Sequence, residues 1–308
     1  MTDEEYDFTL TDRVAKIQAI NEQYDLEHNA YISFSGGLDS VVLSRLVDIA
    51  LPNNTIPRVF ANTGIEYNLM VKYVKSRAVE DSRFIILNQK RNIKETLETY
   101  GYPFKSKEHS LRVEQFNKNH NANYIKKYIT GYDYNKGKQS RFVCPSKLLY
   151  QFQERGKYNY SNLCCYKLKK ELLHTWQKDN KKKIVITGMK NEEGGCRARL
   201  SCLTDNNKKF HPLIVVSQEW EKEFIERERE RVCELYKEPY NFSRTGCKGC
   251  PFSLTLQEQL NTMYIKLPSE YWQCLYLWKP VYDEYIRIGY RLKYYPHEKG
   301  IQLTIDDM

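Results

Sequence analysis

The sequence predicts an α/β fold: a doubly wound, mainly parallel sheet followed by a C-terminal helical segment. Two observations carry this prediction. Short apolar runs rich in β-branched and aromatic residues alternate with segments whose apolar residues recur at helical spacing. In addition, a glycine-rich turn joins the first run to the first helix. Because ligands bind at the carboxyl ends of parallel strands, we expect the functional site at this turn.

The expected elements follow in chain order. Strands are expected at residues 30–34, 58–61, 84–87 and 184–186, with a further edge strand at 211–216. A highly charged helix follows from about 218 to 236. The chain therefore divides into a helical lead-in at 1–29, a nucleotide-binding α/β domain at 30–252 with a basic, tyrosine-rich insertion at about 111–160, and an aromatic helical segment at 253–308.

The turn after the first expected strand reads Ser33-Phe34-Ser35-Gly36-Gly37-Leu38-Asp39-Ser40. Asp39 or Ser40 is placed to cap the helix that follows. Backbone amides at a helix N-terminus attract anions, and the two glycines allow an anion to approach the backbone closely. The Gly-Lys-Ser/Thr ending of a P-loop is missing. We expect a phosphate-binding loop of another kind, with an ordinary tight turn as the alternative.

This string resembles the pyrophosphate loop (PP-loop) of the ATP pyrophosphatase superfamily, whose members split ATP to AMP and pyrophosphate while adenylating a substrate. Two later segments narrow the resemblance to the phosphoadenosine phosphosulfate (PAPS) reductase-like branch. Asn62-Thr63-Gly64-Ile65-Glu66-Tyr67 resembles its DTG-Leu-Glu segment, and residues 183–199, with the string GMKNEEGGCRAR, resemble its G-x-R-x-x-E-S…R loop. The resemblance implies an adenine nucleotide alpha hydrolase-like fold and spans most of residues 33–252.

The resemblance also implies site residues and cofactors. The nucleotide is ATP, or PAPS or adenosine phosphosulfate (APS), with Asp39 as the catalytic carboxylate for Mg²⁺. Cys196, beside Arg197 and Arg199, is a candidate nucleophile or sulfur carrier, with a buried packing residue as the alternative. Lys169 is a candidate charge near both the cysteine-bound cluster and the nucleotide, with a solvated helix face as the alternative. The expected nucleotide-binding residues are Ser33, Ser35, Gly36, Gly37, Leu38, Asp39, Ser40, Asn62, Thr63, Gly64, Glu66, Gly188, Arg197, Arg199 and Lys169.

Four of the nine cysteines are paired in sequence. Cys164 and Cys165 lie in a segment with helical spacing, and Cys247 and Cys250 lie in a Gly- and Pro-containing loop. This Cys-Cys…Cys-x-x-Cys arrangement resembles the pattern by which APS reductases hold a [4Fe-4S] cluster. Zinc also favours thiolates, so zinc and unliganded buried cysteines remain alternatives. The default for the unpaired cysteines other than Cys196 is a small buried residue: Cys144, Cys202, Cys233 and Cys274.

The sequence departs from the reductases in two respects. Assimilatory APS and PAPS reductases carry a catalytic cysteine near the C-terminus, whereas no cysteine follows Cys274 here. Sulfonucleotide reductases also often carry a degenerate form of the pyrophosphate loop sequence, whereas the sequence is complete in this chain. We therefore expect an ATP-consuming enzyme resembling those of DNA phosphorothioation or tRNA thiolation. A sulfonucleotide reductase-like oxidoreductase and a non-catalytic nucleotide- and nucleic-acid-binding accessory protein are the alternatives.

Composition favours an anionic partner. The net charge is +9, and residues 111–160 carry ten Lys or Arg and seven Tyr but three acids. Nucleic acid, DNA or tRNA, is the expected partner, with an Asn-rich surface insertion as the alternative. A cysteine desulfurase or another sulfur donor is also expected. The chain lacks a long uncharged apolar run and a secretory signal pattern, so we expect a cytoplasmic protein without membrane contact. A homo-oligomer is an open alternative.

Overall fold

The computed structural model describes residues 1–193 and 200–299. The chain forms two compact units, each built from segments that are separate in sequence. The first unit contains residues 1–89 and 171–246, and the second contains residues 90–170 together with those from 247 onward.

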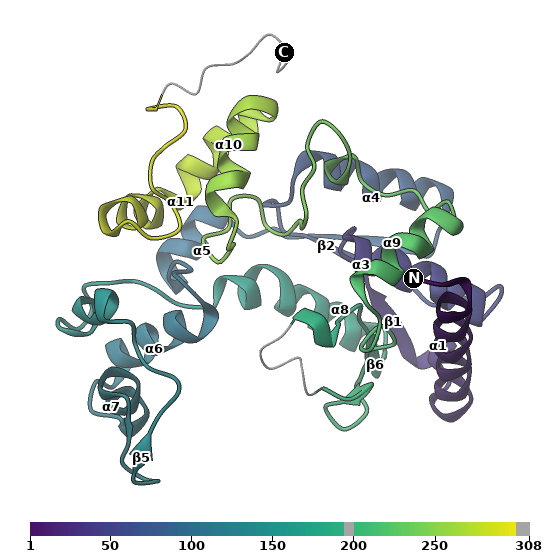
Figure 1. Ribbon diagram of the computed structural model, residues 1–308, viewed down its shortest axis with the longest axis horizontal. Helices are drawn as coiled ribbons and strands as arrows, with labels where there is room; N and C mark the ends of the chain where they lie inside the picture. Colours follow the sequence, from purple (N-terminus) through teal and green to yellow (C-terminus); the bar gives the residue numbers. More distant parts are fainter. Residues whose placement is uncertain (194–199, 300–308) are drawn as a thin grey trace. The chain divides into compact units, whose positions relative to one another are not determined.

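The first unit is built around a six-stranded sheet in the order β3-β2-β1-β6-β8-β7. Figure 1 labels β1, β2 and β6 of this sheet. Neighbouring strands are parallel except β7 and β8, which are antiparallel. This is the expected α/β class with a mainly parallel sheet. The strands are β1 (Ala30–Ser33), β2 (Arg58–Asn62), β3 (Phe84–Asn88), β6 (Ile184–Ile186), β7 (Leu203–Thr204) and β8 (Lys209–Phe210).

Helices cover both faces of this sheet. Residues alternate between the faces along β1, because successive side chains of a strand point to opposite sides. Ala30 and Ile32 join one buried cluster with residues of α1, α3 and α9, whereas Tyr31 joins another with Leu173 of α8. The helices of this unit are α1 (Asp3–Tyr24), α2 (Leu26–Asn29), α3 (Leu38–Ala50), α4 (Asn68–Glu80), α8 (Glu171–Asp179) and α9 (Gln218–Arg227), with 3-10 turns η3 (Asn191–Glu193) and η5 (Glu234–Tyr236).

Two expected elements of this unit were wrong. Residues 211–216 form successive turns instead of an edge strand, since Ile214 N–H donates to His211 O and Val216 N–H donates to Leu213 O. Pro212 has no N–H to offer a strand ladder. The helix expected to reach residue 236 ends at Arg227, and Arg229 adopts a positive φ of 51° that a right-handed helix excludes.

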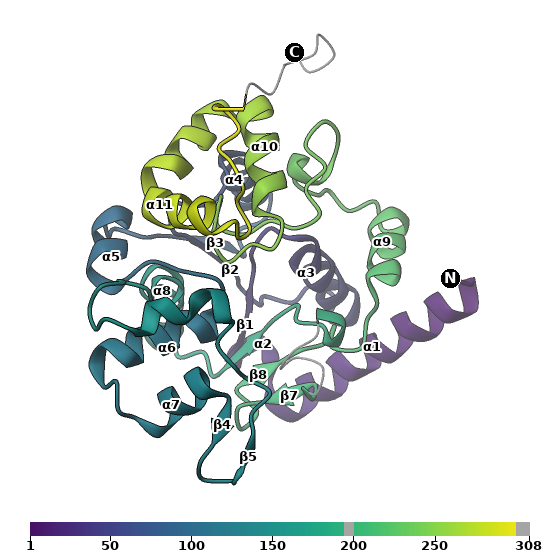
Figure 2. The same ribbon diagram turned by 60° about the vertical axis from the view of Figure 1, so that its left-hand side comes forward.

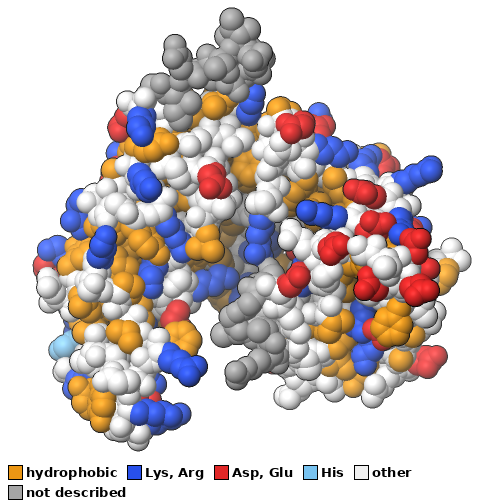
Figure 3. All heavy atoms as spheres, viewed as in Figure 1, with side chains coloured by type: hydrophobic (Ala, Val, Ile, Leu, Met, Phe, Trp, Pro, Cys, Tyr) orange, Lys and Arg blue, Asp and Glu red, His pale blue; other side chains and the backbone are white. Residues whose placement is uncertain are grey.

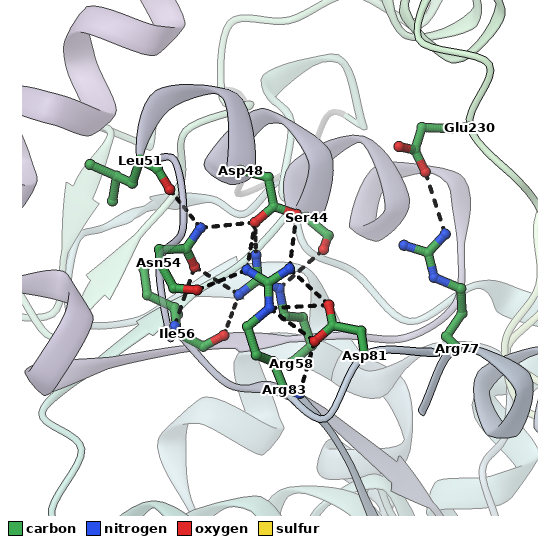
Figure 4. Close-up of polar contacts among 10 residues, drawn as sticks. All are labelled: Ser44, Asp48, Leu51, Asn54, Ile56, Arg58, Arg77, Asp81, Arg83 and Glu230. Atoms are coloured by element: carbon green, nitrogen blue, oxygen red, sulfur yellow. Dashed lines mark hydrogen bonds and ion pairs between the residues drawn. The ribbon is translucent and has the colours of Figure 1, made fainter. Parts of the chain in front are cut away.

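A buried arginine joins α3 to the sheet. Arg58, at the start of β2, is fully buried and donates to Ser44 Oγ at 3.2 Å, to Asn54 Oδ1 at 2.9 Å and to Asp48 Oδ1 at 2.6 Å (Figure 4). Asp48 also pairs with Arg83 at 2.7 Å. Burial lowers the pKa of Arg58 to about 10, and the charge of Asp48 opposes this change.

The second unit is mostly helical (Figure 2). Its core includes Phe104, whose ring stacks on Tyr160 at 4.4 Å and contacts Tyr285 at 4.8 Å. No described helix of the chain is long and apolar enough to cross a membrane. The elements are α5 (Ile93–Tyr100), α6 (Lys107–Lys118), α7 (Asn123–Thr130), β4 (Tyr132–Asp133), β5 (Lys138–Gln139), the 3-10 helix η1 (Ser146–Phe152), the π-helix η2 (Tyr166–Lys170), α10 (Leu256–Lys266) and α11 (Pro268–Ile288).

Candidate functional site

The glycine-rich turn connects β1 to α3, as expected. Gly37 is the N-cap of α3, so the expectation that Asp39 or Ser40 caps this helix was wrong. Ser40 instead closes the loop: its hydroxyl donates to Gly37 O at 2.8 Å and accepts from Ser35 N–H at 3.2 Å. No side chain in the described structure caps the first turn of α3. Amides at such a helix end are suited to an anion.

Two glycines allow the backbone of this site to pack closely. Gly36 has a positive φ of 77°, and a Cβ there would lie 2.2 Å from Met70 Sδ. Gly188, which follows β6, would place a Cβ 2.9 Å from the carbonyl oxygen of Asp39. Because β1 and β6 are neighbours in the sheet, the loops that follow them meet at its carboxyl end. Glycine at position 188 allows this contact.

Two cavities adjoin the loop. The smaller, of about 150 Å³, is lined by Ser33, Ser35, Asp39, Ser40, Gly188, Met189 and Arg244. The larger, of about 350 Å³, shares Ser35, Asp39 and Arg244 with it. The larger cavity is also lined by Gly37, Leu38, Lys190, Glu192, Gln218, Glu221, Lys222, Ile225, Tyr236, Ser243 and Thr245. Hydroxyls, an arginine and a helix N-terminus together suit a phosphate group.

A still larger cavity, of about 820 Å³, opens elsewhere in the same unit. Asn29, before β1, Ile184 of β6 and Lys208, before β8, contribute to its lining, so it lies at the amino ends of the strands. Parallel sheets bind ligands at the other end. Size alone therefore does not make it the candidate nucleotide site.

Lys190 holds two carboxyl groups at the larger cavity. Its ammonium lies 2.8 Å from Asp39 Oδ1 and also pairs with Glu221, and both Lys190 and Glu221 are buried. Burial raises the pKa of Glu221, and the negative charge of Asp39 raises it further. Burial acts to lower the pKa of Lys190, but hydrogen bonds to Asp39 and Glu221 outweigh it, so this pKa is raised. The raised pKa values of both groups favour a protonated Glu221 beside a charged Lys190.

The segment after β2 has a different surrounding. Glu66 is buried, and its Oε2 accepts from both the N–H and the hydroxyl of Thr63 at 2.8 Å. Asn62 bonds to Asn88 at 2.9 Å, and Gly64 N–H donates to Asn62 Oδ1 at 3.2 Å. In the described structure, the two cavities at the loop are lined by none of the expected residues of this segment, which are Asn62, Thr63, Gly64 and Glu66. Glu66 therefore braces its own turn, and its contact with nucleotide stays a prediction.

Three expected residues, Cys196, Arg197 and Arg199, lie outside the described residues. Several cavity residues were not expected from the sequence, chiefly Lys190, Glu221 and Arg244. Lys190 lies within the GMKNEEGG string, two positions after Gly188, so its place in that string was an available signal. Glu221 lies on the charged helix α9, where one buried acid cannot be told from exposed ones by sequence.

All four expected metal ligands lie in the second unit. Cys164 and Cys165 begin the helical turn before η2, and Cys247 and Cys250 lie in a loop, as expected. The pKa of Cys164 is raised by its hydrogen bond with Cys165, by burial, and by negative charge at Cys250 and Cys247. The four thiols therefore feel one another's charge. Their chemistry suits a thiolate-bound metal.

The neighbours of this cysteine set are basic. The hydrogen bond from Cys164 lowers the pKa of Cys165 against the effect of burial, and Lys107 and Lys169 lower it further. Lys169 therefore lies near the cysteine set, as expected, and its contact with nucleotide stays a prediction. Within residues 1–193 and 200–299, however, no three His, Cys, Asp or Glu side chains converge closely enough to enclose a metal ion. A cluster at the four cysteines stays a prediction.

The remaining described cysteines largely match their expected role. Cys144, Cys233 and Cys274 are buried, whereas Cys202 is half-buried.

Comparison with known protein families identifies the chain. The phosphoadenosine phosphosulfate reductase domain family matches residues 29–253. The chain belongs to this family. The matched range begins just before β1 and ends just after Cys250, so it contains the loop, both cavities and the four cysteines. The match confirms the expected resemblance to PAPS reductase-like proteins.

Solved structures similar to this PAPS reductase family member include three enzymes. A PAPS reductase from Candida auris is 14% identical, with a TM-score of 0.44, over 80% of this chain and 96% of that one. FMN adenylyltransferase from Candida glabrata is 14% identical, with a TM-score of 0.46, and the match covers 80% of this chain and 65% of that one. The U34-tRNA thiolase NcsA from Methanococcus maripaludis, with its [4Fe-4S] cluster, is 13% identical, with a TM-score of 0.41, over 91% and 81%. No curated protein matches the chain.

Proposed function

We propose that this PAPS reductase-like PP-loop protein is an ATP pyrophosphatase-type enzyme that adenylates an oxygen of a nucleic acid and helps to replace that oxygen with sulfur. The observation that carries the proposal is the pair of cavities that share Ser35, Asp39 and Arg244 at the complete Ser-Gly-Gly-Leu-Asp-Ser loop. A PAPS or APS molecule has no β,γ-pyrophosphate, so a complete loop favours ATP.

The loop and its surroundings supply what pyrophosphate departure requires. The first amides of α3 are placed to donate hydrogen bonds to phosphate oxygens, and the hydroxyls of Ser35 and Ser40 hold the loop in shape beside them. Arg244 and Lys190 add positive charge where negative charge develops on the leaving group. Preorganised donors of this kind stabilise a transition state without reorganising during the reaction.

Asp39 is the residue that would hold Mg²⁺. Magnesium is commonly bound through one or two carboxylates together with substrate phosphates, and Asp39 and the neighbouring hydroxyls of Ser35 and Ser40 fit this pattern. The ion would supply charge neutralisation at the phosphates. Since Asp39 pairs with Lys190, the lysine must share or release the carboxylate when the ion binds. Lys190 is then free to contact a phosphate.

The proposed reaction has two steps. An acceptor oxygen attacks the α-phosphorus of ATP, so an O–P bond forms while the bond to pyrophosphate breaks. Hydrosulfide from a sulfur donor such as a cysteine desulfurase system then attacks the activated acceptor atom. The bond to sulfur forms, the hydrosulfide proton passes to solvent, and AMP leaves with the former acceptor oxygen. Neither of these two steps changes an oxidation state. Release of hydrosulfide from the persulfide of a cysteine desulfurase takes two electrons, which an external thiol supplies as it is oxidised to a disulfide. Cys164, Cys165, Cys247 and Cys250 would hold the proposed [4Fe-4S] cluster, which takes no part in these two steps.

The test is pyrophosphate release from ATP by anaerobically purified protein, with tRNA, with duplex DNA and without nucleic acid. We expect release that one nucleic acid stimulates, and a loss of about 100-fold in Asp39→Asn. The matched control is Asp12→Asn, an exposed carboxylate on α1. Release that is absent under all three conditions contradicts the proposal.

The second candidate is a sulfonucleotide reductase-like oxidoreductase, which the family match favours. It predicts sulfite production from APS or PAPS with an external thiol. Sulfite production without pyrophosphate release from ATP decides for this candidate. A chain that binds nucleotide and nucleic acid but turns over neither substrate is the accessory-protein alternative.

A further inference from the structure

The hairpin of the second unit carries exposed aromatic side chains. β4 and β5 pair in antiparallel register, with Tyr132 opposite Gln139, and the chain continues through Phe142 and Val143. Phe142 is 71% exposed and Tyr134 is 58% exposed. Val143, next to Phe142, is 43% exposed as well, so several large apolar side chains gather on one hairpin, and such exposed groups mark interaction sites. We define residues 132–147 as the hairpin surface.

The same surface is basic. Its exposed side chains include Lys136, Lys138, Arg141 and Lys147, and no acid occurs between Asp133 and Glu154. Within the described chain, none of these four cations forms an ion pair with a carboxylate. Figure 3 shows Lys and Arg side chains beside hydrophobic ones over this hairpin, at the lower left. Charge complementarity therefore favours a polyanion as the partner.

The single acid of the hairpin surface is already neutralised. Asp133 is buried, and its Oδ2 lies 2.6 Å from the ammonium of Lys127. Its Oδ1 accepts from the N–H groups of Asn135 at 3.2 Å and Lys136 at 3.3 Å. The hydrogen bond from Lys127 lowers the pKa of Asp133, so it remains ionised within these contacts. Asp133 shapes the turn and presents little negative charge to a partner.

The hairpin surface stands on a packed base. Tyr128 of α7 is buried, its carbonyl accepts from Cys144 N–H at 2.7 Å, and its hydroxyl bonds to His109 at 3.0 Å. Ser140 N–H also donates to Gly131 O at 2.7 Å. The ends of the hairpin are thus fixed to a buried aromatic cluster, while Tyr134 and Phe142 face water. Rigid presentation lowers the entropy lost when a ligand orders against these rings.

We infer that the hairpin surface binds a single-stranded segment of nucleic acid, with its cations on the phosphates and Tyr134 and Phe142 stacked on unpaired bases. Bases inside a duplex hide their faces from such rings, whereas unpaired bases expose them. This inference deepens the proposed function by naming an unpaired strand as the acceptor region. The role of that strand as the acceptor rests on the proposed function, whereas its binding to the hairpin surface does not.

The test is fluorescence anisotropy of the full chain with a labelled 15-nucleotide RNA, its DNA equivalent, and each as a duplex. We expect both single strands to bind more tightly than their duplexes. Tyr134→Ala with Phe142→Ala weakens single-strand binding by at least about tenfold, since each stacked base contributes substantially. Lys136→Ala with Lys138→Ala reduces the slope of log K against log salt by about 0.7 for each phosphate that these lysines neutralise.

The matched controls lie on the first unit. Phe8→Ala removes an equally exposed ring, and Lys72→Ala with Lys75→Ala removes two exposed lysines of α4. Both controls keep wild-type binding if the hairpin surface is the site. Circular dichroism confirms that the exposed substitutions leave the fold intact. Equal affinity for duplexes, wild-type binding by both hairpin variants, or no binding at physiological salt overturns the inference.

Binding and catalysis can fail separately. Single-strand binding that the hairpin variants abolish, without any pyrophosphate release from ATP, supports the hairpin surface and contradicts the proposed function. Release stimulated by nucleic acid to the same extent in the wild type and the hairpin variants supports the proposed function and overturns the hairpin surface.

Discussion

The ammonium of Lys190 lies 2.8 Å from Oδ1 of Asp39, so a cation that follows β6 meets a carboxylate that follows β1. The parallel pairing of these two strands brings the residues together, and Glu221 of α9 completes the contact from a third element. The PP-loop lacks the lysine of a P-loop within its own sequence. Here a lysine from a neighbouring strand end occupies the cavity instead.

Lys190→Met is expected to lower kcat/KM for pyrophosphate release by about 100-fold, because it removes a buried charge at the developing pyrophosphate. Lys190→Arg keeps the charge and is expected to recover part of the activity. Lys75→Met, at an exposed lysine of α4 that lines neither cavity at the loop, serves as the control. Wild-type kinetics in Lys190→Met would show that the lysine does not act on the reaction.

Gly188→Ala is expected to lower the same activity by at least about tenfold. The added Cβ would meet the backbone of Asp39 at 2.9 Å and displace the start of α3. Gly246→Ala is the matched control, since its Cβ would meet nothing within 4 Å. Steady-state kinetics of the two variants, with thermal melts to exclude unfolding, makes the comparison. Equal activity in both variants would contradict the close approach.

Arg58→Ala is expected to lower the free energy of unfolding by about 3 kcal/mol or more. The change removes a fully buried cation that holds Asp48 and satisfies several buried acceptors. Arg231→Ala, which breaks an exposed pair with Glu80, is expected to cost about 1 kcal/mol or less. Urea titration of both variants measures the difference, and similar losses would be inconsistent with the burial of Arg58.

Acidification is expected to destabilise the second unit through His109. Burial lowers the pKa of this histidine from 6.5 to about 4. Between these values the unfolded chain binds a proton that the folded chain does not, so the free energy of unfolding falls as pH falls from about 6.5 to about 4. The full loss is about 3 kcal/mol. Urea titrations across this range should show a weaker dependence in His109→Gln, whereas exposed His120→Gln should match the wild type.

Cys247→Ser with Cys250→Ser is expected to abolish iron binding. Anaerobically isolated wild-type protein should hold about four iron and four sulfide per chain, as a [4Fe-4S] cluster requires. Cys233→Ser, at a buried cysteine of the first unit, should keep both. Metal and sulfide analysis distinguishes the alternatives. Zinc found without iron or sulfide would contradict the cluster and indicate a zinc site.

The sheet was predictable because its strands are short apolar runs with clear boundaries. β1, β2, β3 and β6 each agree with expectation to within one residue at either end. The segment 211–216 is equally apolar, but it packs as turns: His211 is buried, bonding Thr187 at 2.7 Å and Thr204 at 3.0 Å. An apolar run predicts that a segment is buried, but it does not distinguish a buried strand from a buried turn.

The candidate site was predictable only where local sequence builds it. The loop from Ser33 to Ser40 is contiguous, so its role as an anion site was accessible. Glu221 and Arg244 reach the cavity through tertiary packing from separate segments, and nothing in their immediate sequence marks them. The burial that raises the pKa of Glu221 is likewise a property of the folded chain.

Because the two units alternate along the chain, each unit is complete only after part of the other has been synthesised. Residues 90–170 leave the ribosome before the segment that begins at 247, which completes their unit. At roughly 5–20 residues per second, the nascent chain waits several seconds with Phe104 and Tyr160 lacking the ring of Tyr285. During the same interval Cys164 and Cys165 are exposed to oxidants and stray metals without Cys247 and Cys250. Production of intact protein should therefore depend on chaperone supply and oxygen tension more than its stability alone would indicate.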